Sequence, residues 1–163
     1  MSMIAVLQQL DEDTIRELLE DPDHGLDVIE RCARDDSVDL DKAWHGLHFL
    51  LTGTAWEGSP PHCFLLMGGE EVEDVDLGYG PARLLRPPAV RAFATALSAL
   101  DEETLRSRFD PARMLEIDIY PAIWDRPVEQ DDTLGYLLAH FAALRDFVGQ
   151  ASAAGRGLLV YLS

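Results

Sequence analysis

Apolar residues gather at the two ends of the chain in short runs that predict β-strands. The run from Met3 to Leu10 contains β-branched residues, and the closing run from Leu158 to Leu162 reads LLVYL. Short apolar runs of this length and composition are typical of buried strands. A third run, from Ala82 to Leu85, predicts another short strand in the middle of the chain.

Between these runs, apolar residues recur at the three- and four-residue spacing of amphipathic helices. Several such segments start at an aspartate, whose side chain can accept the first free backbone N–H groups of a helix. The predicted helices are a segment that Asp11 begins and Pro22 ends, Leu26–Ala33, a segment that Asp39 begins and Gly53 ends, Pro87 or Pro88 to Leu100, short segments after Asp101 and Asp110, and a long helix from Asp131 or Asp132 to Gly155.

The same spacing assigns inward faces, and its absence predicts loops. In the helix after Asp11, the residues expected to face inward are Ile15, Leu18 and Leu19. Cys63–Met67 is apolar and fits a strand or a helix, with a helix preferred. The segments expected to form loops are Asp35–Asp39 and the acidic, glycine-rich stretch Gly68–Gly80, and Ile117–Trp124 is expected to be an extended or turning segment.

The arrangement of these elements predicts an α+β fold. The chain has 163 residues, which suits a single domain spanning residues 1–163. Strands at both chain ends need partners for their backbone groups, so we expect a small central sheet that includes the N- and C-terminal strands and is covered by helices. No apolar run reaches the roughly 18 residues of a membrane span. The acidic N-terminus, MSMIAVLQQLDED, also lacks the basic start of a signal peptide.

The charge of the chain excludes two classes of partner. Thirty acidic residues against 13 basic ones give a formal net charge of −17, which repels nucleic acids and anionic membrane surfaces. The acids concentrate between Asp11 and Asp41, where they form either a solvated face or a docking surface for a basic partner. The partners left open are an unknown protein or a small molecule.

The two cysteines indicate a cytoplasmic protein. Cys32 and Cys63 are far apart and form no CxxC motif, which argues against a disulfide scaffold and against a cysteine-based zinc site. The simplest compartment is therefore a cytosol of bacterial type.

Candidate chemistry concentrates in the stretch Asp41–Gly58, which reads DKAWHGLHFLLTGTAWEG. At 100° per residue, Trp44 and the leucines share an apolar arc. A narrow second arc carries Asp41, His45, His48 and Thr52, each one turn from the next. Helical neighbours three or four residues apart can touch. The polar side chains of this stripe therefore either find hydrogen-bond partners within the core or line a pocket.

Three interpretations of the two histidines stay open. They can be buried residues hydrogen-bonded to Asp41, Glu57 or loop carbonyls. They can line a small-ligand or catalytic pocket, because titratable groups beside aromatic rings favour one. They can bind a metal, but HxxH lacks the glutamate and the spacing of the zinc-hydrolase motif. We expect no stoichiometric zinc and no cofactor.

Further polar clusters suggest places where a pocket could form. Glu57 follows Trp56, and a carboxyl beside an indole can have a raised pKa and act as a general acid or base. The Gly-Gly-Glu-Glu stretch carries two carboxylates beside flexible backbone. The full candidate pocket consists of Asp41, Trp44, His45, His48, Trp56, Glu57, Glu70, Glu71, Tyr79, Arg83, Trp124 and Asp125.

Two of these clusters have specific alternatives. Tyr79 and Arg83 flank a Gly-Pro turn and could be presented to a ligand carboxylate, to Glu70 or to Glu71. The Trp124-Asp125-Arg126 stretch is an ion-paired corner, or an aromatic wall with a charge pair. Each of these clusters can equally be a structural turn or a solvated edge.

The chain contains no assembled catalytic motif. Gly-x-Ser-x-Gly is absent, and no phosphate-binding loop is present because acids replace the lysine of GK[ST]. His62 precedes Cys63, but neighbours on an extended segment point to opposite faces. Nucleophilic catalysis therefore has no support in the sequence.

Several stretches resemble one known family. These are WHGLHFLLTGTAWEG, GGEEV, GYGPARLL, SRFDP, DIYP-IWDR and the closing LLVYLS, which together resemble the YfbM-like family of uncharacterised bacterial proteins over nearly the whole chain. The resemblance implies one compact domain of helices and a small sheet, and it implies no reaction. One departure is Arg86, where family members tend to carry a Thr or Ser that caps the next helix, a contact worth about 1 kcal/mol.

These observations favour a non-catalytic domain that binds a partner or a small ligand. In it, His45 or His48, with Trp44 or Trp56 and Glu57, would form one polar cluster beside the Gly68–Gly80 loop. The alternative is a hydrolase-like enzyme that uses His45, His48 and Glu57.

Overall fold

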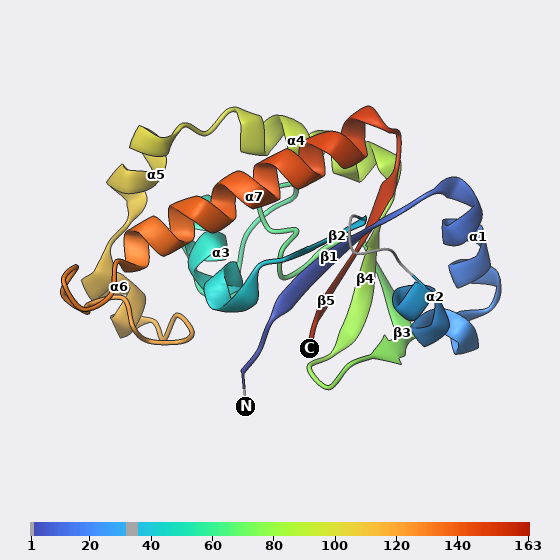
Figure 1. The fold of residues 1–163 in the computed structure, drawn as a ribbon, viewed down its shortest axis with the longest axis horizontal. Helices are drawn as coiled ribbons and strands as arrows, with labels where there is room; N and C mark the ends of the chain where they lie inside the picture. Colours follow the sequence, from blue (N-terminus) through green and yellow to red (C-terminus); the bar gives the residue numbers. More distant parts are fainter. Residues whose placement is uncertain (1, 32–35) are drawn as a thin grey trace.

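The computed structural model describes residues 2–31 and 36–163, and its centre is a five-stranded sheet (Figure 1). Neighbouring strands in the order β2-β1-β5-β4-β3 are all antiparallel. The strands are β1 (Ala5–Leu10), β2 (Ser37–Asp39), β3 (Glu70–Asp76), β4 (Pro81–Leu85) and β5 (Gly157–Leu162).

Helices cover both faces of this sheet. Figure 1 shows α1 and α2 on one side and the long α7, with α3 to α6, on the other. The α-helices are α1 (Glu12–Glu20), α2 (Gly25–Arg31), α3 (Trp44–Thr52), α4 (Pro87–Ser98), α5 (Glu102–Arg108), α6 (Pro111–Glu116) and α7 (Thr133–Ala153). Short 3-10 turns η1 (Pro22–His24) and η3 (Asp41–Ala43) precede α2 and α3.

The two terminal strands lie side by side in the middle of the sheet, as expected. β1 pairs with β5 along its whole length, from Ala5 opposite Leu162 to Leu10 opposite Gly157. Ile4 and Ser163 extend the pairing by exchanging two backbone hydrogen bonds of 2.9 and 2.8 Å. The α+β fold with terminal strands in a central sheet is therefore confirmed.

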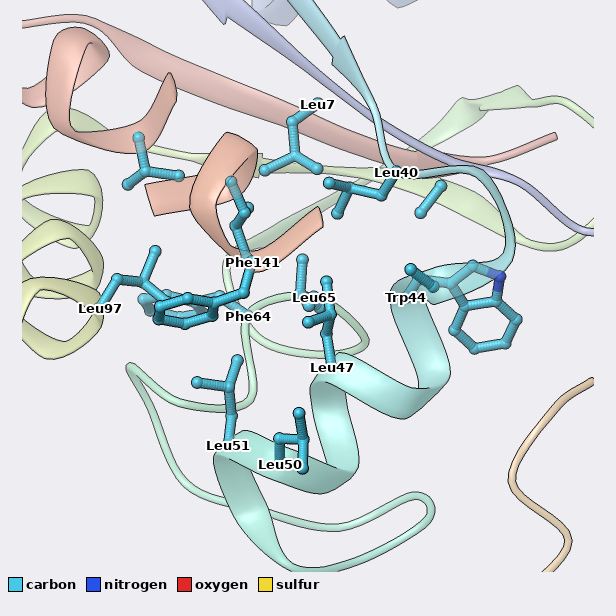
Figure 2. Packing of buried hydrophobic residues seen from close by; sticks show 14 of the residues in the cluster. Leu7, Leu40, Trp44, Leu47, Leu50, Leu51, Phe64, Leu65, Leu97 and Phe141 are labelled. Atoms are coloured by element: carbon cyan, nitrogen blue, oxygen red, sulfur yellow. The ribbon is translucent and has the colours of Figure 1, made fainter. Parts of the chain in front are cut away.

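Because both faces of the sheet are covered, it separates two hydrophobic cores. Alternate residues of one strand enter different cores: Leu158 and Val160 face the larger core, and Leu159 and Tyr161 face the smaller one. In the larger core, Figure 2 shows Leu47 of α3 beside Leu65, with Phe141 and Leu7 nearby. Burial on both faces explains why β5, in the middle of the sheet, has an apolar sequence without interruption.

Aspartate side chains cap four helices, three of them at the residue expected. Asp11, Asp101 and Asp110 accept backbone N–H groups from residues three positions later, at 2.7–3.1 Å. Asp132, one of two residues proposed for the long helix, does the same for α7. Arg86 provides no side-chain cap, yet α4 still begins at Pro87, whose ring presets the helical φ angle.

Two predicted loops are strands at the edges of the sheet. Ser37–Asp39, within the loop expected at 35–39, pairs with β1, and Glu70–Asp76, within the expected acidic loop, pairs with β4. The register shifts between Val72 and Asp76, which removes the two-residue alternation that identifies a strand. Polar and acidic edges also protect a sheet from pairing with other chains, so these strands lack an apolar signature.

Three smaller expectations were wrong. Cys63–Met67 forms successive turns instead of a helix. Leu19 is 40% exposed, because α1 presents only a narrow stripe to the smaller core. Asp39 accepts the N–H of Asp41 at 2.7 Å and so precedes η3, while α3 begins at Trp44 without a side-chain cap. Cys32, the end of the helix expected at 26–33 and the start of the loop expected at 35–39 lie outside the described residues.

Gly46 lets α3 approach α7 closely. A Cβ built on Gly46 would lie 2.7 Å from Leu137 Cδ2 and 2.9 Å from Trp124 Cη2. The Trp124 ring is held by a hydrogen bond from its Nε1 to the Ile119 carbonyl, at 2.8 Å, and cannot easily move away. The absent side chain is therefore part of the packing between these helices.

Gly46→Ala is expected to lower the free energy of unfolding by about 1–3 kcal/mol, because the new methyl group overpacks this contact. Gly149→Ala is the matched control, since a Cβ at Gly149 in α7 meets nothing within 4 Å. It should raise stability by about 0.5–1 kcal/mol through helix propensity. Urea unfolding followed by circular dichroism measures both, and equal shifts in the two variants would contradict this account of the α3–α7 contact.

Candidate functional site

His45 is a fully buried histidine with both ring nitrogens bonded to backbone. Its Nδ1 accepts the N–H of Tyr120 at 2.8 Å, and its Nε2 lies 2.8 Å from the Ala55 carbonyl. An amide N–H only donates, so Nδ1 carries no proton and Nε2 donates to Ala55. Burial lowers the pKa of His45, which favours this neutral form. The imidazole therefore joins two loops, at residues 53–58 and 117–122.

Aromatic rings pack around His45. Trp44 stacks on it with ring centroids 4.9 Å apart, and Trp56 contacts it at 4.4 Å. Trp44 also stacks on Tyr120 and donates its Nε1–H to the Met3 carbonyl at 2.9 Å. Trp44 is fully buried, whereas Trp56 is 60% exposed. Of the predicted cluster, His45, Trp44 and Trp56 are thus in mutual contact. His45 and Trp44 are buried, and Trp56 lies at the exposed edge.

His48 lies one turn further along α3 and is also fully buried. Its Nε2 bonds to the Glu57 carbonyl at 2.8 Å, and its Nδ1 has no hydrogen-bond partner among the described residues. Burial lowers the pKa of His48 to about 4, so the ring is neutral at pH 7.

Glu57 meets the histidine helix through its backbone only. Glu57 is exposed. The Thr54 hydroxyl donates a hydrogen bond to the Glu57 carbonyl at 2.7 Å and accepts one from the Glu57 N–H at 3.1 Å. Among the described residues, no hydrogen bond or ion pair involves its carboxylate. The general-base geometry that the sequence suggested for Glu57 and the histidines is not formed in this structure.

Asp41 belongs to a different contact. The Tyr136 hydroxyl, on α7, donates to Asp41 Oδ2 at 2.7 Å and accepts the N–H of Lys42 at 3.1 Å. Burial raises the pKa of Tyr136, and the bond to Asp41 raises it further. Asp41 therefore fixes η3 against α7, and its carboxylate is not among the hydrogen-bond partners of the two histidine rings.

Three other candidate residues line one hollow beside strands β3 and β4. Glu71, Tyr79 and Arg83 surround a cavity of about 150 Å³. The remaining wall is mostly apolar and consists of Leu65, Leu66, Gly80, Pro81, Val160, Tyr161 and Leu162.

Arg83 is the buried cation of this hollow. In β4 it alternates with Ala82 and Leu84, which face the smaller core, so it lies on the side of the larger core. It is only 9% exposed, and it donates to the carbonyls of Phe64 at 2.9 Å and Gly68 at 3.1 Å. Burial lowers the pKa of Arg83 to about 10, which leaves it charged at pH 7.

The acidic residues beside Arg83 differ sharply in their contacts. Glu70 forms a bidentate pair with Arg86, at 2.8 and 3.1 Å. Glu71 lies directly opposite Arg83 in the β3–β4 register, yet the ion pairs found among the described residues include neither of them. Opposite charges therefore share this hollow without being joined.

Trp124 and Asp125 border a separate, wider groove of about 820 Å³ at α6 and the start of α7. Trp124 itself is 1% exposed and belongs to the larger core, so it offers no aromatic wall. Arg126 pairs at 3.0 Å with Asp131, and not with the adjacent Asp125. The candidate pocket is thus divided among five places: the aromatic cluster with the adjoining His48 and Glu57, the Asp41 contact, the surface pair of Glu70 with Arg86, the small hollow and this groove.

The described residues contain no group of three His, Cys, Asp or Glu side chains placed to hold a metal ion. Cys63 is a buried free thiol whose pKa is raised by burial, so it is not an activated nucleophile. No helix within the described ranges is long and apolar enough to span a membrane.

Sequence reasoning missed Tyr120 and Tyr136, which hold His45 and Asp41. Tyr120 acts mainly through its backbone N–H, which leaves no trace in the residue pattern. Tyr136 lies one turn inside α7, so its position on the side facing η3 could be deduced only with the helix packing known.

Comparisons with known proteins agree with this fold. Residues 1–161 match the family described as a domain of unknown function, DUF1877. Protein YfbM of Escherichia coli strain K12 is 30% identical over 131 residues, covering 76% of this chain and 75% of YfbM. The crystal structure of YfbM, a protein of unknown function, matches with a TM-score of 0.77 and 26% identity, over 98% of this chain and 99% of that one. The chain therefore belongs to the DUF1877 family.

Proposed function

We propose that this chain is a non-catalytic cytosolic domain that binds a small carboxylate-bearing ligand in the hollow formed by Glu71, Tyr79 and Arg83. The observation that carries the proposal is Arg83, a nearly buried guanidinium at the wall of a cavity, which forms no ion pair with the described residues. Buried charges in proteins are normally paired, so an unpaired one beside a cavity supports an anionic group bound there.

The chemistry of Arg83 suits a carboxylate. A guanidinium has five N–H donors in a rigid fork, and two carbonyls, of Phe64 and Gly68, accept from Arg83. These bonds orient the side chain, and further donors can serve a ligand. Carboxylates bind such a fork through paired hydrogen bonds, and Tyr79 adds a hydroxyl at the same cavity.

The histidines support binding more than catalysis. His45 and His48 are fully buried, so neither ring faces a substrate or water in solvent, as a general base must. The Glu57 carboxylate bonds to neither of them among the described contacts. The hydrolase-like alternative would require these three groups to meet a substrate together.

Titration with propionate, followed by amide chemical shifts, tests the proposal. In the wild-type protein, the shifts should centre on residues 79–83 and 71. Arg83→Lys should weaken propionate binding at least about tenfold, because an ammonium keeps the charge but loses the fork. Arg86→Gln, which breaks only the exposed pair with Glu70, is the matched control and should bind as the wild type does.

Arg83→Lys is preferred to Arg83→Gln because it retains a donor for the Phe64 or Gly68 carbonyl. Circular dichroism must show that the variant is folded, and Tyr79→Phe provides a second, milder variant in which binding weakens. If the shifts in wild-type protein centre on the histidine helix instead of these residues, the proposal is wrong.

A further inference from the structure

Resting on the proposed function, we infer that the ligand is a small zwitterion, of the class of short α-amino acids, whose carboxylate binds Arg83 and whose ammonium group binds Glu71. The inference comes from the pairing of opposite charges around one cavity. A ligand with only a carboxylate would engage Arg83 and leave Glu71 facing it with a like charge.

The positions of Glu71 and Arg83 are set by the sheet. They are direct partners in the antiparallel β3–β4 register, and both line the hollow. Directly opposite residues have Cβ atoms about 4.5–5.5 Å apart, within easy reach of an ion pair. The carbonyls of Phe64 and Gly68 accept hydrogen bonds from the guanidinium, and no N–O distance of 4.0 Å or less joins it to the Glu71 carboxylate. The two charges are thus available on the same cavity.

The neighbouring acid shows what a structural pair looks like in this sheet. Glu70, one residue earlier, forms two hydrogen bonds to Arg86 on the surface. Glu70 is thus joined to Arg86, which directly follows β4, whereas Glu71 and Arg83 are opposite each other and not joined. Only the separated pair, Glu71 and Arg83, lines a cavity.

The net charge of −17 also favours a zwitterion over an anion. A protein field of this sign repels a free carboxylate and lowers its rate of association. A zwitterion has no net charge, so the long-range field does not exclude it. Its two ends then interact with local charges at short range, where the field of the whole surface matters less.

The size and the wall of the hollow restrict the ligand further. Its volume of about 150 Å³ is below the roughly 300–1,000 Å³ of pockets that hold drug-sized molecules and cofactors. It corresponds to about five water molecules, which suits a compact ligand. Leu65, Leu66 and Val160 form an apolar wall that fits a short aliphatic side chain.

Three small ligands with similar carbon skeletons test the two charges separately. Alanine carries both a carboxylate and an ammonium group, propionate carries only the carboxylate, and ethylamine carries only the ammonium group. Alanine should bind the wild-type protein at least about tenfold more tightly than either propionate or ethylamine, by calorimetry or by chemical-shift titration. In Glu71→Gln, alanine should lose this advantage and bind within about threefold of propionate. Glu70→Gln is the matched control, one residue away and outside the hollow, and should keep the wild-type preference.

The outcomes distinguish this inference from the proposed function. If propionate binds as tightly as alanine, or if Glu71→Gln leaves the preference for alanine unchanged, the zwitterion inference is wrong and carboxylate binding at Arg83 stands. If neither alanine nor propionate binds, both proposals are wrong. Because Glu71 is exposed, its replacement should leave the fold intact, which circular dichroism can verify.

Discussion

Replacing Trp44 with alanine is expected to lower the free energy of unfolding by about 3–5 kcal/mol. The indole is fully buried, stacks on His45 and Tyr120, and donates a hydrogen bond to Met3. Its removal leaves a large cavity and an unpaired carbonyl, and both costs add to the lost burial. Urea unfolding followed by far-UV circular dichroism measures the change.

Trp56→Ala is the matched control within the same aromatic cluster. Its ring contacts His45 at a centroid distance of 4.4 Å but is 60% exposed, so its loss should cost only about 0.5–1 kcal/mol. A large gap between the two variants would show that the cluster stabilises the junction of α3 with its neighbouring loops. Equal losses would contradict that role for Trp44.

Acidification from pH 7 to pH 4 is expected to remove about 3 kcal/mol of stability through His48. Burial lowers the pKa of His48 from 6.5 to about 4 in the folded state. Above pH 6.5 the ring is neutral in both states, so its contribution is fully present. Between pH 6.5 and 4 the unfolded chain binds a proton that the folded chain does not, and stability falls. His45, whose pKa burial also lowers, acts in the same direction.

A comparison of variants isolates this effect from the many carboxylates that titrate nearby. His48→Gln cannot protonate, and its amide can still donate to the Glu57 carbonyl, so its stability should vary much less with pH over this range. His24→Gln is the control, because His24 is exposed and its pKa is raised by the hydrogen bond to Asp21. Parallel stability curves for wild type and His48→Gln between pH 7 and 4.5 would rule out the mechanism.

Much of the fold was predictable because local chemistry determines it. Aspartates at helix starts accept the free N–H groups of their own first turn, so Asp11 and Asp101 cap helices regardless of distant packing. The apolar arc of α3 likewise predicted the burial of Trp44 and Leu47, and the apolar runs at both ends predicted β1 and β5. In each case the information lies within one or two turns of chain.

The candidate site was predictable only in part. The helical wheel placed His45 and His48 on one stripe and left open whether that stripe is buried or lines a pocket. The Tyr79–Arg83 stretch was predicted to present its side chains to a ligand carboxylate, to Glu70 or to Glu71. Their partners could not be deduced, because His45 and His48 bond to backbone groups of Ala55, Tyr120 and Glu57. Backbone groups are the same at every position, so only the path of the loops decides which of them reaches a ring.

The sequence by itself determined most of the helices, the central strands and the common stripe of His45 and His48 on α3, since side-chain spacing and caps act locally. Only the tertiary structure decided that β2 and β3 are strands, because an edge strand is held by the backbone of its neighbour and needs no apolar pattern. Strand pairing also brought Glu71 opposite Arg83, while the carbonyls of Phe64 and Gly68 kept the guanidinium from that carboxylate. The proposed binding site therefore arises from long-range register, which no local pattern of residues encodes.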